Sequence, residues 1–329
     1  MTYENEISEI IKNNLLSRDE IFDYRDTPLE IYCNKLFLYY KALIRNNSDI
    51  YDIEPNFFVF KNKTTVNASA VVKEGCSLVS INIGTIKELK EIFLDNAKQT
   101  KDIFGESIQE LDQFLVDKKS SVMDFMYNSA SIFLLNHEIG HLIQNIDKIE
   151  LNLNESNEEI SDFNIDRHIY EVDSDIFSAM KLSQDIYRIW DDFDDTFKTD
   201  LLLCNLISLA TSAIGVFKLF NLNAEKGIYY KEKSHPHVSI RVTIIQEIMV
   251  DFISHLSGST ISEEYKNITI SNSLSIIEKL NIYKGDSFFN DFVALTLENS
   301  DNIEEYSKFL ILEVSTNKNC SYYKMRNYR

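Results

Sequence analysis

The chain has 329 residues, a formal net charge of −19 and 44% hydrophobic residues, which together indicate a globular protein with ample length for a core. The acidic balance disfavours nucleic acids and anionic membrane surfaces as partners. Because only 3 prolines and 8 glycines interrupt the long amphipathic runs, we expect a mainly α-helical protein with a small β-sheet, an α+β fold. The four cysteines form no C-x-x-C pair and the first residues are acidic, so we expect reduced thiols, no signal peptide and a cytoplasmic location.

The first 50 residues predict two helices, of which the first is short and spans residues 3–16. Thr27-Pro28-Leu29-Glu30 predicts the start of the second, because threonine can cap a helix, proline suits the first helical position and glutamate completes a capping box. We expect this second helix to run to about Arg45.

A change of periodicity then predicts a small sheet of three strands, at 56–60, 66–72 and 77–83. The turn 73–75 separates the second strand from the third, and Gly84 is expected to close the third. Thr85 is expected to cap a helix that runs to about Phe104. A polar connection with a helical turn or two should follow over 105–120.

The next stretch carries the motif H-E-x-x-H. Ser121 with Asp124 predicts an N-terminal cap, and apolar residues surround the motif, so we expect a buried helix of about 25 residues. His137 and His141 lie one helical turn apart, so both imidazoles can bind one metal ion. Glu138 can then reach a water in the open position of that metal. This is the arrangement of a zinc site whose bound water loses a proton to a carboxylate.

The segment 147–166 is acidic and rich in asparagine, and it predicts an exposed loop. A helix over 169–180 follows, and there Glu171 and Asp175 share one face. We expect Glu171 to be the third metal ligand and Asp175 to accept the free N–H of a ligating histidine, His141. Other candidates for the third ligand are His168, Asp173 and Asp175.

Residues 201–217 contain no charge and are the only candidate for a membrane span. Their polar residues and the charges that flank them favour a core helix. Further on, Pro236 is expected to start a helix that runs to about Leu256, which places His235 just before the helix and Arg241 in its second turn. Beyond residue 257 we expect three more amphipathic helices, at 272–282, 287–298 and 302–315.

Taken in order, these residues resemble a family of zinc metallopeptidases that includes HtpX and the CAAX prenyl protease. The family pattern is an N-A-x-A strand, a strand that leads into a helix, H-E-x-x-H, E-x-x-x-D and H-P-x-x-x-x-R. Order and content fit over about 66–241, with the matching residues Asn67-Ala68-Ser69-Ala70, 81–86 with Leu89, 137–141, Glu171 with Asp175, and His235-Pro236 with Arg241. A phage-exclusion peptidase of the Lit kind is a second gluzincin-like candidate.

The resemblance implies a gluzincin-like fold with a zinc site between two core helices, held by His137, His141 and Glu171. It implies that Glu138 is the catalytic base, that His235 helps to stabilise the oxyanion and that Arg241 orients nearby groups. It also implies that the strand at Asn67–Val72 is a sheet edge that binds the substrate backbone through Asn67, Ala68, Ser69 and Ala70.

The chain departs from HtpX because it lacks several obvious membrane spans, so the substrate class is not carried over. We divide it into N-terminal helices (1–50), a metallopeptidase core (51–256) and a C-terminal helical region (257–329) packed on the core. The sequence therefore predicts a cytoplasmic, Zn²⁺-dependent endopeptidase that acts on a protein or peptide. The alternatives are a non-catalytic scaffold on a metallopeptidase fold and a protease anchored in a membrane through 201–217.

Overall fold

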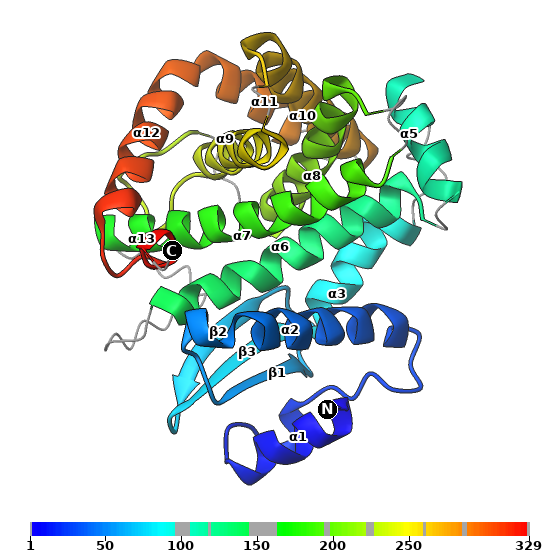
Figure 1. Cartoon of the computed structure of the whole chain (residues 1–329), viewed down its shortest axis with the longest axis vertical. Helices are drawn as coiled ribbons and strands as arrows, with labels where there is room; N and C mark the ends of the chain where they lie inside the picture. The colour runs from blue at the N-terminus through cyan, green and yellow to red at the C-terminus, as the bar shows by residue number, and fades with distance from the viewer. Residues whose placement is uncertain are drawn as a thin grey trace.

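A computed structural model shows a mainly helical protein with one small sheet, as the composition predicts (Figure 1). It describes residues 2–95, 106–117, 120–144, 163–193, 198–221, 227–258, 261–284 and 288–327. The expected loop at 147–166 lies mostly outside these ranges. The division into three parts stays a prediction. One hydrophobic cluster contains residues from all three of those parts.

The N-terminal part has two helices, α1 (Tyr3–Lys12) and α2 (Glu30–Tyr51), joined through the short 3₁₀-helix η1 (Arg18–Glu20). Helix α2 begins at Glu30, where the Thr27 hydroxyl accepts a hydrogen bond from the Leu29 amide. It ends six residues beyond the predicted position. Figure 1 shows α2 lying across the sheet and α1 beyond the β1 edge, and the rings of Tyr3 and Phe37 bring the two helices into contact.

The sheet has the strand order β1-β3-β2, with β1 (Asn56–Lys61) parallel and β2 (Ala68–Lys73) antiparallel to β3 (Cys76–Asn82). A two-residue hairpin, Glu74-Gly75, joins β2 to β3. Both residues have positive φ angles, 51° and 74°, as a type I′ turn requires. The three predicted strands and the turn are therefore confirmed.

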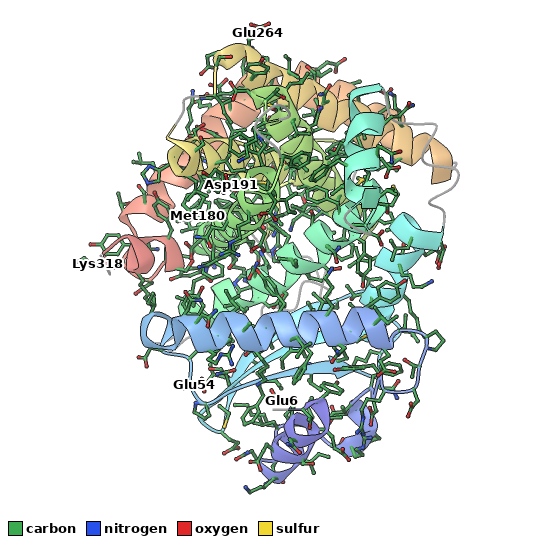
Figure 2. All side chains as sticks on the ribbon, turned by 45° about the vertical axis from the view of Figure 1, so that its right-hand side comes forward. Glu6, Glu54, Met180, Asp191, Glu264 and Lys318 are labelled. Carbon is green, nitrogen blue, oxygen red and sulfur yellow. The ribbon has the colours of Figure 1, made fainter. Side chains whose placement is uncertain are left out.

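The two edges of this sheet differ. At the β1 edge, the side chains of Glu6 and Tyr3 from α1 accept hydrogen bonds from the amides of Phe58 and Phe60. Figure 2 shows Glu6 on α1 beside the sheet. The β2 edge has no further strand paired to it within the described residues. One edge is thus covered from inside the chain, and the other can take a strand.

The helix after the sheet begins earlier than predicted. Helix α3 (Ile83–Lys90) follows directly on β3, so Gly84 lies inside the helix and Thr85 is not its cap. The Thr85 hydroxyl instead bonds to the backbone of Asn67, which ties the start of β2 to α3. A π-helical turn, η2 (Glu91–Asp95), extends α3. The predicted end near Phe104 falls outside the described residues, and part of the expected polar connection is a three-turn helix, α5 (Glu106–Asp117).

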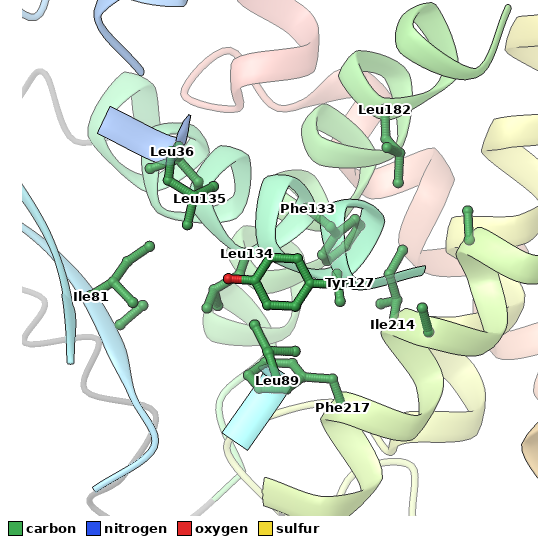
Figure 3. Packing of buried hydrophobic residues seen from close by; sticks show 14 of the residues in the cluster. Leu36, Ile81, Leu89, Tyr127, Phe133, Leu134, Leu135, Leu182, Ile214 and Phe217 are labelled. Atoms are coloured by element: carbon green, nitrogen blue, oxygen red, sulfur yellow. The ribbon is translucent and has the colours of Figure 1, made fainter. Parts of the chain in front are cut away.

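The rest of the chain forms a packed set of helices. The two that carry the predicted ligands, α6 and α7, contact each other, α6 also contacts α8 and the sheet, and α7 also contacts α9. Figure 3 shows apolar side chains of α6 meeting residues from α2, β3, α3, α7 and α8. The bounds are α6 Val122–Gln144, α7 Ile165–Asp191, α8 Asp200–Asn221, α9 Val238–Ser257, α10 Glu263–Lys284, α11 Phe288–Glu298, α12 Ser300–Thr316 and α13 Ser321–Asn327.

Helix α8 contains the uncharged run 201–217. By length and composition, Asp200–Leu219 is long and apolar enough to cross a membrane, but 83% of its apolar window is buried inside the protein. This burial is what a core helix shows, and it supports the first of our two interpretations. Helix α13 follows α12 after a short turn and was not predicted.

Candidate metal centre

The helix α6 holds both histidines of the motif in the protein interior. Its start is capped as predicted, because the Ser121 hydroxyl accepts a hydrogen bond from the Asp124 amide and donates one to the Asp124 carboxylate. His137 and His141 then lie one turn apart, and only 1% and 2% of their surfaces are exposed. Glu171 of α7 is fully buried beside them.

The three side chains converge on one point. The Nε2 atoms of His137 and His141 are 3.1 Å apart. The carboxylate of Glu171 lies 3.4 Å from His137 Nε2 and 3.5 Å from His141 Nε2. A tetrahedral metal with bonds of about 2.0–2.1 Å holds its ligand atoms about 3.3 Å apart. The two histidine nitrogens and the Glu171 carboxylate, which meets them through its two different oxygens, therefore lie close to the spacing of three corners of a zinc tetrahedron.

The outer nitrogen of each histidine faces a side-chain acceptor. His137 Nδ1 lies 3.1 Å from Oδ1 of Asp175. His141 Nδ1 lies 3.0 Å from Oε1 of Gln144. The prediction that Asp175 pairs with His141 is thus wrong: the crossing of α6 and α7 brings Asp175 to His137, and Gln144 takes the place at His141. An imidazole whose Nδ1 donates to such an acceptor is neutral only when its Nε2 carries no proton, and that Nε2 can then bind a metal.

The hydrogen bonds of Gln144 fix which way its amide points. Its nitrogen lies 2.8 Å from the carbonyl oxygen of Tyr170 and 2.6 Å from the carboxylate of Asp173. Both partners only accept hydrogen bonds, so the amide NH₂ group must face them and the oxygen must face His141. His141 Nδ1 is therefore a donor. This places the lone pair of His141 on Nε2, at the point where the three ligand atoms meet.

Arg241 binds the carboxylates of Glu171 and Asp175 on α7. Its guanidinium forms a bidentate pair with Asp175 at 2.6 and 3.0 Å and lies 3.1 Å from Glu171. Lys218 of α8, also buried, lies 3.5 Å from Asp175. Burial raises the pKa of Asp175, but Arg241 and Lys218 outweigh it and hold that pKa well below its usual range. Burial also opposes ionisation of Glu171, and His235 and Arg241 overcome it and keep the pKa of Glu171 low.

The electrostatic field at the centre favours a cation. Burial alone lowers the pKa of His137, yet Asp175 and Glu171 raise it to about 9. Among the described residues, the buried carboxylates of Glu171 and Asp175 lie beside the buried cations Lys218 and Arg241, and the raised pKa of His137 adds a proton to this group. Buried carboxylates are costly unless a cation compensates them. A metal ion bound to the imidazole would take the place of that proton.

The rival ligands have other partners. The ring of His168 lies 2.8 Å from the backbone oxygen of Lys233 and 3.1 Å from the Tyr306 hydroxyl. Asp173 accepts hydrogen bonds from the amides of Ser321 and Tyr322 and from Gln144. Neither of them belongs to the convergent cluster, which consists of His137, His141 and Glu171.

Glu138 and His235, the predicted base and oxyanion residue, differ in exposure. Glu138 is buried on α6, and its charge opposes the fall in the pKa of Lys61 of β1 that burial causes. His235 lies 3.5 Å from the Glu171 carboxylate, and 25% of its side chain is exposed. His235 is therefore the most accessible member of the group. Its assignment to the oxyanion stays a prediction.

The helix after His235 begins two residues later than predicted. Pro236 does not begin the helix, because α9 starts at Val238 with His237 as its N-cap. The Nδ1 atom of His237 accepts a hydrogen bond from the Ser239 amide at 3.1 Å. His235 then lies two residues before the cap.

The predicted substrate strand is the open edge of the sheet. The Asn82 amide donates to the Asn67 oxygen, and antiparallel pairs alternate, so the odd-numbered residues of β2 bond to β3. The backbone N–H and C=O groups of Ala68, Ala70 and Val72 point to the other edge. Helix α6 packs against β2, so this edge belongs to the same region as the motif.

Close packing of α6 on α7 depends on a glycine inside the motif. A Cβ atom on Gly140 would lie 3.0 Å from both Cα and Oγ of Ser174. This contact lets the helices approach until Glu171 reaches the two histidines. Sequence reasoning did not identify Gly140, Gln144, Ser174 or Lys218. The position of Gln144, three residues after His141 on the same helix face, was the one local signal available.

Comparison of the chain with protein-family models, with curated proteins and with solved structures finds no match in any of the three.

Proposed function

We propose that the protein is a zinc-dependent endopeptidase with a gluzincin-like site. The observation that carries this proposal is the convergence of two imidazole Nε2 atoms and one carboxylate, 3.1–3.5 Å apart, in the protein interior. Three protein ligands leave a fourth position of a tetrahedral ion for water or substrate, whereas structural zinc sites usually have four. The H-E-x-x-H motif, and the resemblance to the HtpX and CAAX prenyl protease family, agree with it.

The residues of the chain divide the work as follows. His137, His141 and Glu171 hold the ion, with Asp175, Gln144 and Arg241 fixing their orientation. Zinc bound there would lower the pKa of a bound water to about 7. Glu138 is the residue that would accept a proton from the attacking water and return it to the leaving amine.

The substrate side of the proposal rests on the open edge of β2. An extended peptide can pair with the backbone groups of Ala68, Ala70 and Val72, which places its chain along the sheet beside α6. Asn67 and Ser69 are then flanking positions. The substrate is a protein or peptide in the cytoplasm. The net charge of −19 disfavours nucleic acid as a partner.

A second function is favoured by one observation, the burial of the cluster. His137, Glu138 and His141 are each exposed by 2% or less, and Glu171 is fully buried. A closed site is typical of structural zinc. The alternative is thus a non-catalytic scaffold stabilised by zinc, in which Glu138 has no chemical role.

Metal analysis and three variants separate these possibilities. Purified wild type should bind one zinc per chain, Glu171→Gln should lose it, and His255→Gln, a change of an exposed histidine, should keep it. Glu138→Gln should keep zinc but lower the hydrolysis of a peptide library, followed by mass spectrometry, by about 10²–10⁴-fold. Equal hydrolysis by wild type and Glu138→Gln contradicts the peptidase, and zinc without any hydrolysis in wild type favours the scaffold.

A further inference from the structure

The C-terminal helix α13 contacts both helices of the candidate metal centre. On α7, the carboxylate of Asp173 accepts hydrogen bonds from the amides of Ser321, at 2.6 Å, and Tyr322, at 2.9 Å. On α6, the last turn receives Lys324, whose ammonium donates to the Ile143 oxygen at 2.8 Å. The helix thus binds one free carbonyl and one buried carboxylate, which both need donors.

The contact on α7 continues to a metal ligand. The Asp173 oxygen that accepts from the Ser321 amide also accepts from the Gln144 nitrogen at 2.6 Å. The side-chain oxygen of Gln144 faces His141 Nδ1 at 3.0 Å. An unbroken series of hydrogen bonds therefore runs from the first residue of α13, through Asp173 and Gln144, to the imidazole of His141.

Each member of this series is buried, and one residue runs parallel to it: the Ser174 hydroxyl accepts from the Gln144 nitrogen and lies 3.0 Å from His141 Nδ1. Asp173 is fully buried, and both of its oxygens are used. Without the two amides of α13, its carboxylate would keep Gln144 as its one side-chain donor among the contacts described. Gln144 would then be drawn toward Asp173, and its hold on the tautomer and orientation of His141 would weaken.

We propose that docking of α13 positions His141 for metal binding, so that the affinity for zinc and the docking of the C-terminal helix are coupled. The inference rests on the proposed metal site and adds a control of that site from the end of the chain. By thermodynamic reciprocity, zinc must strengthen the docking of α13 by the factor by which docking strengthens zinc binding.

A proline at the first position of α13 tests the coupling. Ser321→Pro removes the amide that donates to Asp173, at the helical position that accepts proline best. Ser321→Ala is the matched control, because it keeps the amide and loses only the hydroxyl. Zinc affinity is measured on the full chain by competition with a chelating dye. We expect affinity to fall by about 10-fold or more in Ser321→Pro, the size seen for groups that orient a metal ligand, and by less than about 2-fold in Ser321→Ala.

A second measurement distinguishes coupling from a general loss of stability. Amide hydrogen exchange of Ser321 and Tyr322 in wild type should slow on addition of zinc, by the factor found in the affinities. Lys324→Met removes the bond to Ile143 but keeps the apolar stem. It should lower the zinc affinity, as Ser321→Pro does, and should speed amide exchange at Ser321 and Tyr322. Unchanged zinc affinity in Ser321→Pro, or exchange that does not respond to zinc, overturns the inference while leaving the metal site intact. A wild type that binds no zinc overturns the proposed function first, and the inference with it.

Discussion

At the scale of single residues, Arg241 binds two carboxylates at once, and together with His235 it keeps the candidate ligand Glu171 ionised. Its contacts with Asp175 and Glu171 are fully buried. Such a pair adds little net stability compared with apolar residues, but removing one partner leaves an uncompensated charge that costs about 3–5 kcal/mol. The group is therefore better understood as a device for orientation than as a source of stability.

His168 lies on the same helix as Glu171. The pKa of His168 predicts that the stability of the fold depends on pH. Burial is the main reason that its pKa falls from 6.5 to about 4, and the hydrogen bond to Lys233 opposes that fall. The folded protein thus prefers neutral His168. Its contribution to stability is complete above pH 6.5 and is lost as the pH falls toward 4, by at most about 3 kcal/mol.

His168→Gln should remove this part of the acid sensitivity. Denaturant unfolding at pH 7 and pH 4.5 gives the change in the free energy of unfolding for each protein. We expect a smaller drop for His168→Gln than for wild type, while His255→Gln, at an exposed position on α9, should behave as wild type does. Identical drops in all three proteins would show that His168 is charged or accessible in the folded state.

At the scale of elements, the alternation of backbone bonds along β2 predicts that prolines at two neighbouring positions lower the stability by different amounts. The amide of Val71 bonds to β3, whereas the amide of Val72 points to the open edge. Val71→Pro should lower the free energy of unfolding by about 2 kcal/mol or more, since it removes a ladder bond and introduces a clash. Val72→Pro should change it by less than about 1 kcal/mol.

The same pair tests whether peptides bind at this edge. Val72→Pro removes a donor that a paired substrate would use, so kcat/KM for peptide hydrolysis should fall by about 10-fold, which corresponds to one lost hydrogen bond. Unchanged kcat/KM in a stable Val72→Pro protein would place the substrate elsewhere. The stability measurement on Val71→Pro is the control that the register is the one described.

What the sequence predicted at this scale was local. The cap at Ser121 and the spacing of His137 and His141 depend on one helix only, and both are confirmed. Thr85 also looked like a cap, but its hydroxyl bonds to Asn67, 18 residues away, and no local pattern announces such a contact. The same reason explains why α13 was missed: its seven residues depend on Asp173, almost 150 positions earlier.

At the scale of the whole molecule, α8 connects the candidate metal centre to the C-terminal helices. Its hydroxyls bond to backbone oxygens of α10, from Ser208 to Thr269 at 3.1 Å and from Ser212 to Ser273 at 3.0 Å. At its other end, Lys218 reaches Asp175 beside the ligands. A helix with these partners cannot also face lipid without giving them up, so the core and membrane interpretations of 201–217 exclude each other.

Two equal substitutions in α8 decide between these interpretations. Leu206 is fully buried, whereas 40% of Leu201 is exposed on the same helix. In a core helix, Leu206→Asp leaves a cavity and an unpaired buried charge and should cost about 4 kcal/mol or more of stability, while Leu201→Asp should stay within about 0.5 kcal/mol. Denaturant unfolding of the two variants, and fractionation of the wild type after expression, give the answer. The core interpretation requires wild type in the supernatant without detergent and a large difference between the variants. Recovery only with detergent, together with equal damage from both aspartates, would instead establish a helix surrounded by lipid.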